Sequence, residues 1–298
     1  MFRGPYGVLL TPFTKEGKVD YNAMEFELDF LLKSDIQGFF ACGTTGEFVS
    51  LSPKENIELM AFVAKRIGGK KQLLAGASDP NPATSISYLK AASDLGYDAA
   101  MICPPYYFTM KQDDVVRYYK YMADQNIIDL ILYKIPMFTN TIELPSFERL
   151  LQEKRIVGMK DSSGNMKQIA HEADIVLRKR PDFSLLTGTD DCIVPALLAG
   201  CVGSVTAFSV IVPEVNATIY KLYNEGHIKE AQELNRKALR LLRLADSVMF
   251  PSGYKLVYEQ RNFPMGHCQV VDEQAIRALR LAMRAELDEL FKGIKKIG

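Results

Sequence analysis

The feature that most constrains this 298-residue chain is a series of short apolar runs, each followed by a stretch with helical periodicity. The eight runs lie at residues 8–10, 36–40, 72–76, 99–102, 130–133, 156–159, 183–186 and 202–205. They are apolar throughout and do not alternate cleanly with polar residues, which is typical of parallel strands covered by helices. Their starts lie roughly 20–35 residues apart, which fits a repeated strand–helix unit. Eight such units favour an α/β fold of the (β/α)8 TIM-barrel type.

An open doubly wound sheet is compatible with the same pattern of runs. No GxGxxG sequence follows the first run, so a dinucleotide-binding version of that fold has no support. One helix start is especially well marked, because Ser52 precedes a proline and then Glu55, which together predict a capping box. Two glycines at residues 68–69 predict the end of the same helix.

The strand pattern stops near residue 213, and helical periodicity continues at 216–224, 229–245 and 272–295. We therefore expect residues 1–225 to form the barrel. Residues 226–298 are expected to form a C-terminal helical region packed on it, which would cover the barrel or contact another subunit.

Composition argues against several classes of function. The chain has 36 basic and 36 acidic residues, so it lacks the positive excess expected of a nucleic-acid-binding protein. Five cysteines are scattered without a CxxC pair, and three histidines lie far apart, so no metal site is predicted. No apolar run approaches about 18 residues, and the N-terminal sequence lacks a signal-peptide core. We expect a cytoplasmic protein that does not enter the membrane.

Catalytic groups of a barrel enzyme lie at the C-terminal ends of its strands. Lys160 follows the apolar run at 156–159, and apolar surroundings lower the pKa of a lysine until its amine can attack a carbonyl. Tyr133 ends the preceding run, where a phenol could transfer protons. A lysine at a strand end is more often salt-bridged or directed to solvent, but its combination with Tyr133 favours catalysis.

A glycine- and threonine-rich loop follows the second run. Its sequence is GTTGE at residues 43–47, and Gly43 leaves backbone N–H groups near Thr44 and Thr45 open to a ligand. Such a loop is either a carboxylate-binding site or simply a turn. Two acidic residues, Asp190 and Asp191, follow the seventh run, where they would bind substrate hydroxyls or cap a helix at 192–198.

Together these motifs resemble the dihydrodipicolinate synthase / N-acetylneuraminate lyase superfamily of class I pyruvate-dependent aldolases. The resemblance extends over almost the whole chain and includes GTTGE at 43–47, the tyrosines at 106–107, Tyr133 with Ile135 and Pro136, GMKD at 158–161, and Gly188. It implies a homotetramer of barrels, built as a dimer of dimers. It also implies a lyase that forms a Schiff base and needs no metal or cofactor.

The resemblance assigns roles to individual residues. Lys160 matches the lysine that forms the imine with pyruvate, and Tyr133 matches the phenol that transfers protons. Thr44 and Thr45 match the hydroxyl pair that contacts the pyruvate carboxylate. Four further positions match parts of the family's site: Tyr107, which reaches into the neighbouring subunit's site, the backbone of Gly203, which contacts the oxo acid, and the substrate-binding glycines Gly43 and Gly188.

One position departs from the synthases of this family. Two residues after the proline that matches Pro136, the synthases carry an arginine that holds the carboxylate of aspartate semialdehyde, whereas this chain has Phe138. A phenyl ring cannot form a bidentate contact with a carboxylate, although Lys134 could supply a substitute cation. The segment at 187–191 is more similar to that of the sugar-acid aldolases, in which acidic residues hold substrate hydroxyls.

The predicted activity is therefore the cleavage or formation of a 2-oxo acid with pyruvate as one partner and an aldehyde as the other. A 2-keto-3-deoxy sugar acid, N-acetylneuraminate and 4-hydroxy-2-oxoglutarate are the candidate substrates. The alternative is 4-hydroxy-tetrahydrodipicolinate synthase, which condenses pyruvate with aspartate semialdehyde. Two other classes are less compatible with the sequence. Intact Lys160 and Tyr133 argue against a catalytically silent oxo-acid-binding protein, and no His, Asp and Glu cluster at the ends of the runs supports a metal-dependent aldolase or a flavin-dependent barrel enzyme.

Overall fold

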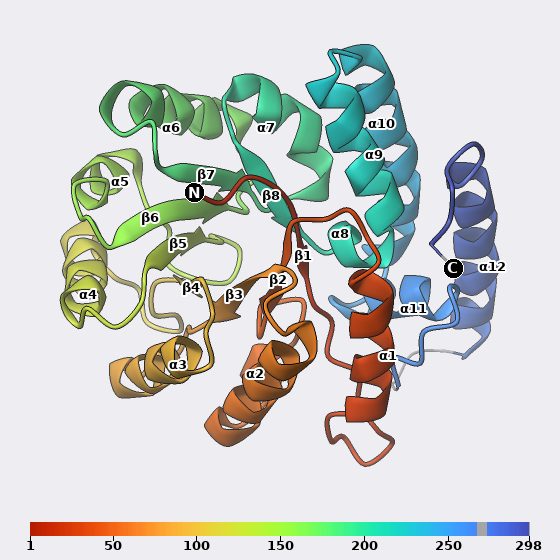
Figure 1. Cartoon of the computed structure of the whole chain (residues 1–298), viewed down its shortest axis with the longest axis horizontal. Helices are drawn as coiled ribbons and strands as arrows, with labels where there is room; N and C mark the ends of the chain where they lie inside the picture. The colour runs from red at the N-terminus through yellow and green to blue at the C-terminus, as the bar shows by residue number, and fades with distance from the viewer. Residues whose placement is uncertain (267–272, 298) are drawn as a thin grey trace.

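The centre of the molecule is a closed barrel of eight parallel strands that follow one another in chain order, with β8 paired to β1 (Figure 1). The computed structural model describes residues 1–266 and 273–297. The predicted TIM barrel is confirmed. The strands are β1 (Gly4–Val8), β2 (Gly38–Ala41), β3 (Gln72–Gly76), β4 (Ala99–Ile102), β5 (Leu130–Lys134), β6 (Ile156–Asp161), β7 (Ser184–Thr187) and β8 (Gly203–Thr206).

Helices surround the barrel, and the later ones gather on one side of it (Figure 1). The helices between strands are α1 (Tyr21–Leu31), α2 (Pro53–Ile67), α3 (Pro82–Asp94), α4 (Gln112–Asp124), α5 (Leu144–Leu150), α6 (Met166–Lys179) and α7 (Ile193–Ala199). The helices after β8 are α8 (Phe208–Ile211), α9 (Pro213–Asn224), α10 (Ile228–Ala245), α11 (Ser252–Glu259) and α12 (Glu273–Leu290). Two short 3-10 helices, η1 (Phe48–Ser50) and η2 (Asp190–Cys192), lie in the loops. Among the described helices, none is long and apolar enough to cross a membrane.

Every predicted run corresponds to a strand, and the runs at 72–76 and 99–102 match β3 and β4 residue for residue. The largest error is at the first strand, predicted at 8–10 but observed at Gly4–Val8. Leu9 and Leu10 are fully apolar and buried, but they lie just beyond the last paired residue of β1. Burial therefore extends past the hydrogen-bonded ladder, and an apolar run alone does not show where pairing ends.

The core has two layers. Inside the barrel, side chains such as Tyr6, Phe40, Ile131 and Leu186 fill the space between the strands. A larger apolar cluster lies between the strands and the surrounding helices. A filled barrel interior is a packed core and not a pore, so an open site can form only at the ends of the strands.

Local sequence signals position helix α2 as predicted. The Ser52 side chain accepts a hydrogen bond from the Glu55 N–H, and the Glu55 carboxylate accepts one from the Ser52 N–H. Gly68 ends the helix in the left-handed conformation, with φ of +56°. Glycine adopts this conformation with no steric penalty.

After β8 the sequence predicted α9, α10 and α12 approximately and missed α8 and α11. The first residue of the predicted helix at 272–295 lies outside the described part of the chain. Helix α8 has four residues, too few to show a period. Helix α11 is buried at every position from Ser252 to Tyr258, so it has almost no exposed face. Its eight residues span only about two turns, too few to show a clear helical period.

Candidate active site

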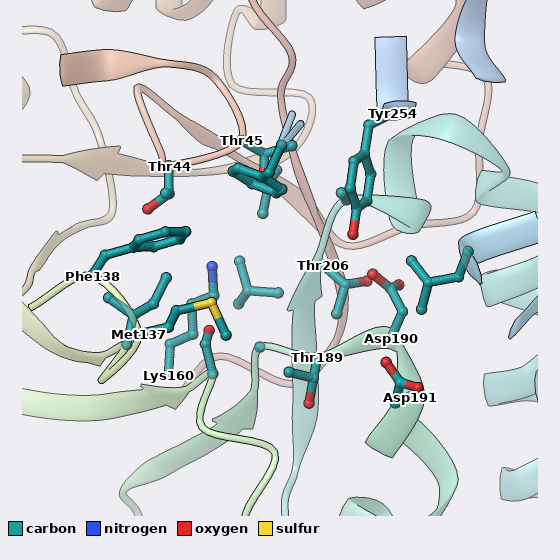
Figure 2. Close-up of a pocket in the computed structure, with 18 of the residues that line it drawn as sticks. Thr44, Thr45, Met137, Phe138, Lys160, Thr189, Asp190, Asp191, Thr206 and Tyr254 are labelled. Carbon is teal, nitrogen blue, oxygen red and sulfur yellow. The ribbon is translucent and has the colours of Figure 1, made fainter. Parts of the chain in front are cut away.

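A cavity of about 360 Å³ opens at the C-terminal ends of the strands (Figure 2). The barrel supplies most of its wall, and helices α10 and α11 with their connecting segment close one side. Among the predicted residues, the cavity is lined by Thr44, Thr45, Tyr133, Phe138, Lys160, Gly188, Asp190 and Asp191.

Lys160 lies on β6 with its amine directed into the cavity (Figure 2). Its side chain is 3% exposed, and Nζ lies 4.3 Å from the centroid of the Tyr133 ring and 5.0 Å from that of Phe40. Within the described residues, no carboxylate lies within salt-bridge distance of this amine. Burial lowers the pKa of Lys160 to about 7, and the charge of Asp190 acts in the opposite direction. A large share of the lysine is therefore the neutral amine at physiological pH.

Tyr133 meets Lys160 because β5 and β6 are neighbours in the barrel and these two residues are paired in register. The hydroxyls of Tyr133 and Thr44 lie 3.1 Å apart, within hydrogen-bond distance. Burial raises the pKa of the Tyr133 phenol well above its usual value, and the contact with Thr44 lowers it slightly. The phenol therefore stays protonated at rest, next to the amine and with a hydroxyl partner.

The GTTGE loop brings Thr44 and Thr45 to the cavity wall. Gly43 lets the start of the loop pack closely on the Phe40 ring, because a Cβ at this position would lie 2.6 Å from that ring. Gly188 makes room for the lysine, since a Cβ there would lie 2.8 Å from Cε of Lys160. Both glycines are thus required by close approach.

Asp190 is a buried acidic group on the side of the cavity opposite Phe138 (Figure 2). Burial raises the pKa of Asp190 to about 7, while the side chain of Thr206 and the backbone of Phe208 act to lower it. Its Oδ1 atom makes no hydrogen bond to any described residue. Because Asp190 lines the cavity and a buried carboxyl oxygen needs a hydrogen-bond partner, this group is a candidate to accept a hydrogen bond from a ligand hydroxyl.

Asp191 is placed differently, because its carboxylate forms an ion pair with Arg243 of helix α10. Neither Asp190 nor Asp191 caps the following helix, which was the other use expected for them. Helix α7 begins at Ile193 with Cys192 as its N-cap, and in this described segment no side chain forms a hydrogen bond with the N-terminal N–H groups of the helix.

Phe138 borders the cavity with its ring half exposed and 6.0 Å from the ring of Phe250. Lys134 does not replace the missing arginine. It is 1% exposed and points away from the cavity, with Nζ 2.6 Å from Asp161 and 2.8 Å from Glu172. Among the described residues that line the cavity, Lys160 is therefore the one basic group, whereas three are acidic: Asp190, Asp191 and Asp246.

Several lining residues were not predicted from the sequence. Tyr254 on α11 donates a hydrogen bond to Asp246, at 3.0 Å, and both line the cavity. Thr206 and Ala207 extend from β8, and Phe250 precedes α11. These residues carry no local motif, and three of them lie more than 80 residues beyond Lys160, so only the fold brings them to the site.

Besides Gly43, two predicted site residues do not line this cavity. Gly203 is the first residue of β8, where its backbone pairs with Gly4 and Leu186, and the cavity is lined instead by the far end of that strand. Tyr107 lies outside the cavity of its own chain, with 91% of its side chain exposed and its ring 5.1 Å from that of Phe108.

In the parts of the chain described, no group of three or more His, Cys, Asp or Glu side chains is arranged to hold a metal ion. His267 and Cys268 lie outside those parts.

Known proteins share both the sequence and the fold. The Dihydrodipicolinate synthetase family matches residues 1–273. The chain is 33% identical over 263 residues to an uncharacterized DapA-like lyase of Thermococcus kodakarensis, covering 88% of this chain and 90% of that one. It is 33% identical over 246 residues to a 4-hydroxy-tetrahydrodipicolinate synthase of Endomicrobium trichonymphae, covering 82% and 83%.

The structure of YagE, a prophage protein of the same family from E. coli solved in complex with pyruvate, has a TM-score of 0.91 at 23% identity. The match covers 97% of this chain and 99% of YagE, and it shows the fold. The sequence relationships go further: this chain belongs to the dihydrodipicolinate synthetase family and is a lyase of the class I aldolase type.

Proposed function

We propose that Lys160 forms an imine with the carbonyl of a 2-oxo acid and that the protein is an aldolase with pyruvate as one partner. The observation that carries this proposal is the buried Lys160 amine, whose pKa is lowered to about 7, beside the Tyr133 phenol. A neutral amine attacks a carbonyl carbon, whereas an ammonium ion cannot.

In the cleavage direction, the Lys160 amine adds to C2 of the substrate, and loss of water gives a protonated imine. In the dehydration step Tyr133 donates its phenol proton to the leaving hydroxyl and becomes a phenolate. The phenolate then accepts the proton of the C4 hydroxyl while the C3–C4 bond breaks and releases an aldehyde. The bonding electrons move to the imine nitrogen and leave the enamine of pyruvate. Protonation at C3 and hydrolysis then release pyruvate and restore the amine. The Thr44 hydroxyl, 3.1 Å from that of Tyr133, supplies a path for the proton.

The imine nitrogen itself accepts the electrons in this scheme, so the reaction needs no metal or other cofactor. Thr44 and Thr45 are proposed to hold the carboxylate of the oxo acid next to Lys160. Activity is expected to be unchanged after dialysis against a chelator, and loss of activity that added metal restores would contradict this part of the mechanism.

The charge of the cavity supports an aldehyde partner without a carboxylate. Lys160 is consumed by the imine, and among the described lining residues no other cation is then left to pair with a second carboxylate. Asp191 and Asp246 are already paired with Arg243, and hydroxyl groups can donate hydrogen bonds to the lining carboxyl groups. This favours a 2-keto-3-deoxy sugar acid or a related 4-hydroxy-2-oxo acid over aspartate semialdehyde.

A homotetramer, built as a dimer of dimers, is part of the proposal. The support within the chain is Tyr107, an aromatic side chain that is 91% exposed and packs against Phe108, which is 77% exposed. Large aromatic residues that stand out from the surface in this way are enriched in protein interfaces. The site of one subunit would then be completed by a neighbouring one.

A substrate panel tests the assignment. Pyruvate release would be measured from a 2-keto-3-deoxy sugar acid, N-acetylneuraminate and 4-hydroxy-2-oxoglutarate, beside condensation of pyruvate with aspartate semialdehyde. We expect kcat/KM to be highest for a substrate that yields an uncharged, hydroxylated aldehyde, and Lys160→Ala to abolish the reaction. Preferred condensation with aspartate semialdehyde would instead assign the chain as a 4-hydroxy-tetrahydrodipicolinate synthase.

A further inference from the structure

Lys255, on helix α11, is buried next to the loop that carries Thr44 and Thr45. It is 1% exposed, and its Nζ lies 2.5 Å from Oε1 of Glu47, the last residue of that loop. We propose that Lys255 is a positioning residue: through Glu47 it holds the loop in the shape that receives the carboxylate of the 2-oxo acid. This inference rests on the proposed function, because it concerns how that carboxylate is bound.

The backbone at Glu47 shows why the loop needs such support. Glu47 has φ of +59°, in the left-handed region that side chains other than glycine rarely adopt. Its N–H donates a hydrogen bond to the carbonyl of Thr44, at 3.0 Å, so the same residue closes the turn that presents Thr44. A strained residue persists only where its surroundings fix it, and here Lys255 fixes the side chain.

Two further contacts hold the loop from the barrel side. The Thr11 hydroxyl donates to the Gly46 carbonyl at 2.6 Å, and the Asn56 amide donates to the Phe48 carbonyl at 3.0 Å. Lys255 adds a link to the C-terminal helices, since it belongs to α11. Tyr254, its neighbour on that helix, lines the main cavity. Helix α11 thus contacts both the cavity and the loop at 43–47.

The charges around Lys255 determine which variant is informative. Glu27 is fully buried near the lysine, and burial raises the pKa of Glu27 to about 8 while Lys255 acts to lower it. Among the described residues, Glu47 is the carboxylate within ion-pair distance of Lys255, whereas Glu27 responds only to its charge. Replacing Lys255 would change the surroundings of both carboxyl groups, whereas Glu47→Gln removes only the link to the loop.

A second buried ion pair provides a matched control. Arg261 and Glu214 lie 2.7 Å apart and are 10% and 4% exposed, but neither lines the cavity with Lys160. Glu214→Gln breaks a pair of the same kind at a distance from the loop. A purely structural role for Lys255 and Glu47 predicts that Glu47→Gln and Glu214→Gln behave alike.

The experiment traps the imine with borohydride at a series of pyruvate concentrations, using the full chain, and records the unfolding temperature of each variant. In Glu47→Gln we expect the pyruvate concentration for half-maximal trapping at Lys160 to rise about tenfold, because a displaced binding loop weakens binding. In Glu214→Gln it should stay within about twofold of the wild type, even where the unfolding temperature falls. Lys255→Arg, which keeps the charge, should lie closer to the wild type than Lys255→Met.

A wild-type pyruvate requirement in Glu47→Gln, or equal shifts in Glu47→Gln and Glu214→Gln, would overturn the inference. If Glu47→Gln does not fold, Glu47→Asp replaces it, with a shorter reach but the same charge, and the same rise is expected. A wild-type requirement in Glu47→Asp would again overturn the inference. Failure to trap pyruvate on the wild-type protein would instead contradict the proposed function, so the two failures are distinguishable.

Discussion

Lys160 is a basic residue in a place where a positive charge is poorly solvated, and this should govern the pH dependence of catalysis. Its pKa is lowered to about 7 by burial. Because only the neutral amine attacks the carbonyl, kcat/KM should rise about tenfold per pH unit below pH 7 and level off above roughly pH 8. Steady-state kinetics between pH 5 and 9 would measure this, because that range extends about two pH units to either side of the lowered pKa. A midpoint near that of an ordinary lysine would contradict the prediction.

The same burial should lower stability. Folded Lys160 loses its proton near pH 7, whereas in the unfolded chain it does so near the usual pKa of 10.5. Between these values the unfolded state binds more protons, so the contribution of this group to stability increases as the pH rises. Lys160→Met should therefore raise the free energy of unfolding at pH 7, by roughly 1–3 kcal/mol, and raise it less at pH 10. Urea unfolding at the two pH values tests this, and an equal or lower stability of the variant at pH 7 would contradict it.

Single residues were predictable where a local pattern carried them. Lys160 and Tyr133 stand at the ends of apolar runs, and strand pairing brings them together as expected. Tyr254 on α11 and Phe250 just before it reach the cavity from a segment that carries no site motif, so nothing in their neighbourhood indicated a site. Gly203 does not line the cavity, because an apolar run shows that a strand exists but not which of its residues reaches the mouth of the barrel.

At the scale of elements, a buried charge cluster joins β5, β6 and α6. Lys134 contacts Asp161 at 2.6 Å and Glu172 at 2.8 Å, and burial, together with the charge of Asp161, raises the pKa of Glu172 to about 8. Lys134→Met leaves two buried carboxyl groups without their cation and should lower the free energy of unfolding by about 3–5 kcal/mol.

Equilibrium unfolding in urea measures this loss. Adding Asp161→Asn to Lys134→Met removes one of the two carboxylates and should recover part of the stability. If Lys134→Met proved as stable as the wild type, Lys134 would not be neutralising these carboxyl groups.

The elements themselves were predicted well where periodicity and capping agreed, as in helix α2 with its capping box at Ser52. Strand edges were less certain. The chain is buried on both sides of the last residue of β1, so hydrophobicity does not mark the point where hydrogen bonding ends. Buried α11 shows a related limit for helices, because a segment of about two turns is too short to show a clear helical period.

At the scale of the whole molecule, the cavity is built jointly by the barrel and the helices that follow it, through Tyr254 and Asp246 on one side and the GTTGE loop on the other. Such an arrangement was only partly visible in the sequence, which indicated a C-terminal helical region but not that it closes the site. Long-range packing decides this, and no spacing between neighbouring residues encodes it.

Assembly should also be visible at this scale. Sedimentation velocity is expected to give a species of four times the 33.4 kDa chain mass. Tyr107→Ala should weaken the assembly and reduce turnover, because the exposed ring of Tyr107 is proposed to enter a neighbouring subunit's site. Tyr121→Ala is a suitable control, since it removes another exposed tyrosine from helix α4. A wild-type monomer with full activity would contradict the prediction.

The central claim, that Lys160 carries the reaction as an imine, is tested most directly by reducing the wild-type protein with borohydride in the presence of pyruvate and mapping the modified peptide by mass spectrometry. The account predicts one pyruvate-derived adduct, on Lys160, and no adduct in Lys160→Ala. An adduct on another lysine such as Lys134 or Lys255, or an unmodified wild-type protein that still turns over its substrate, would contradict it.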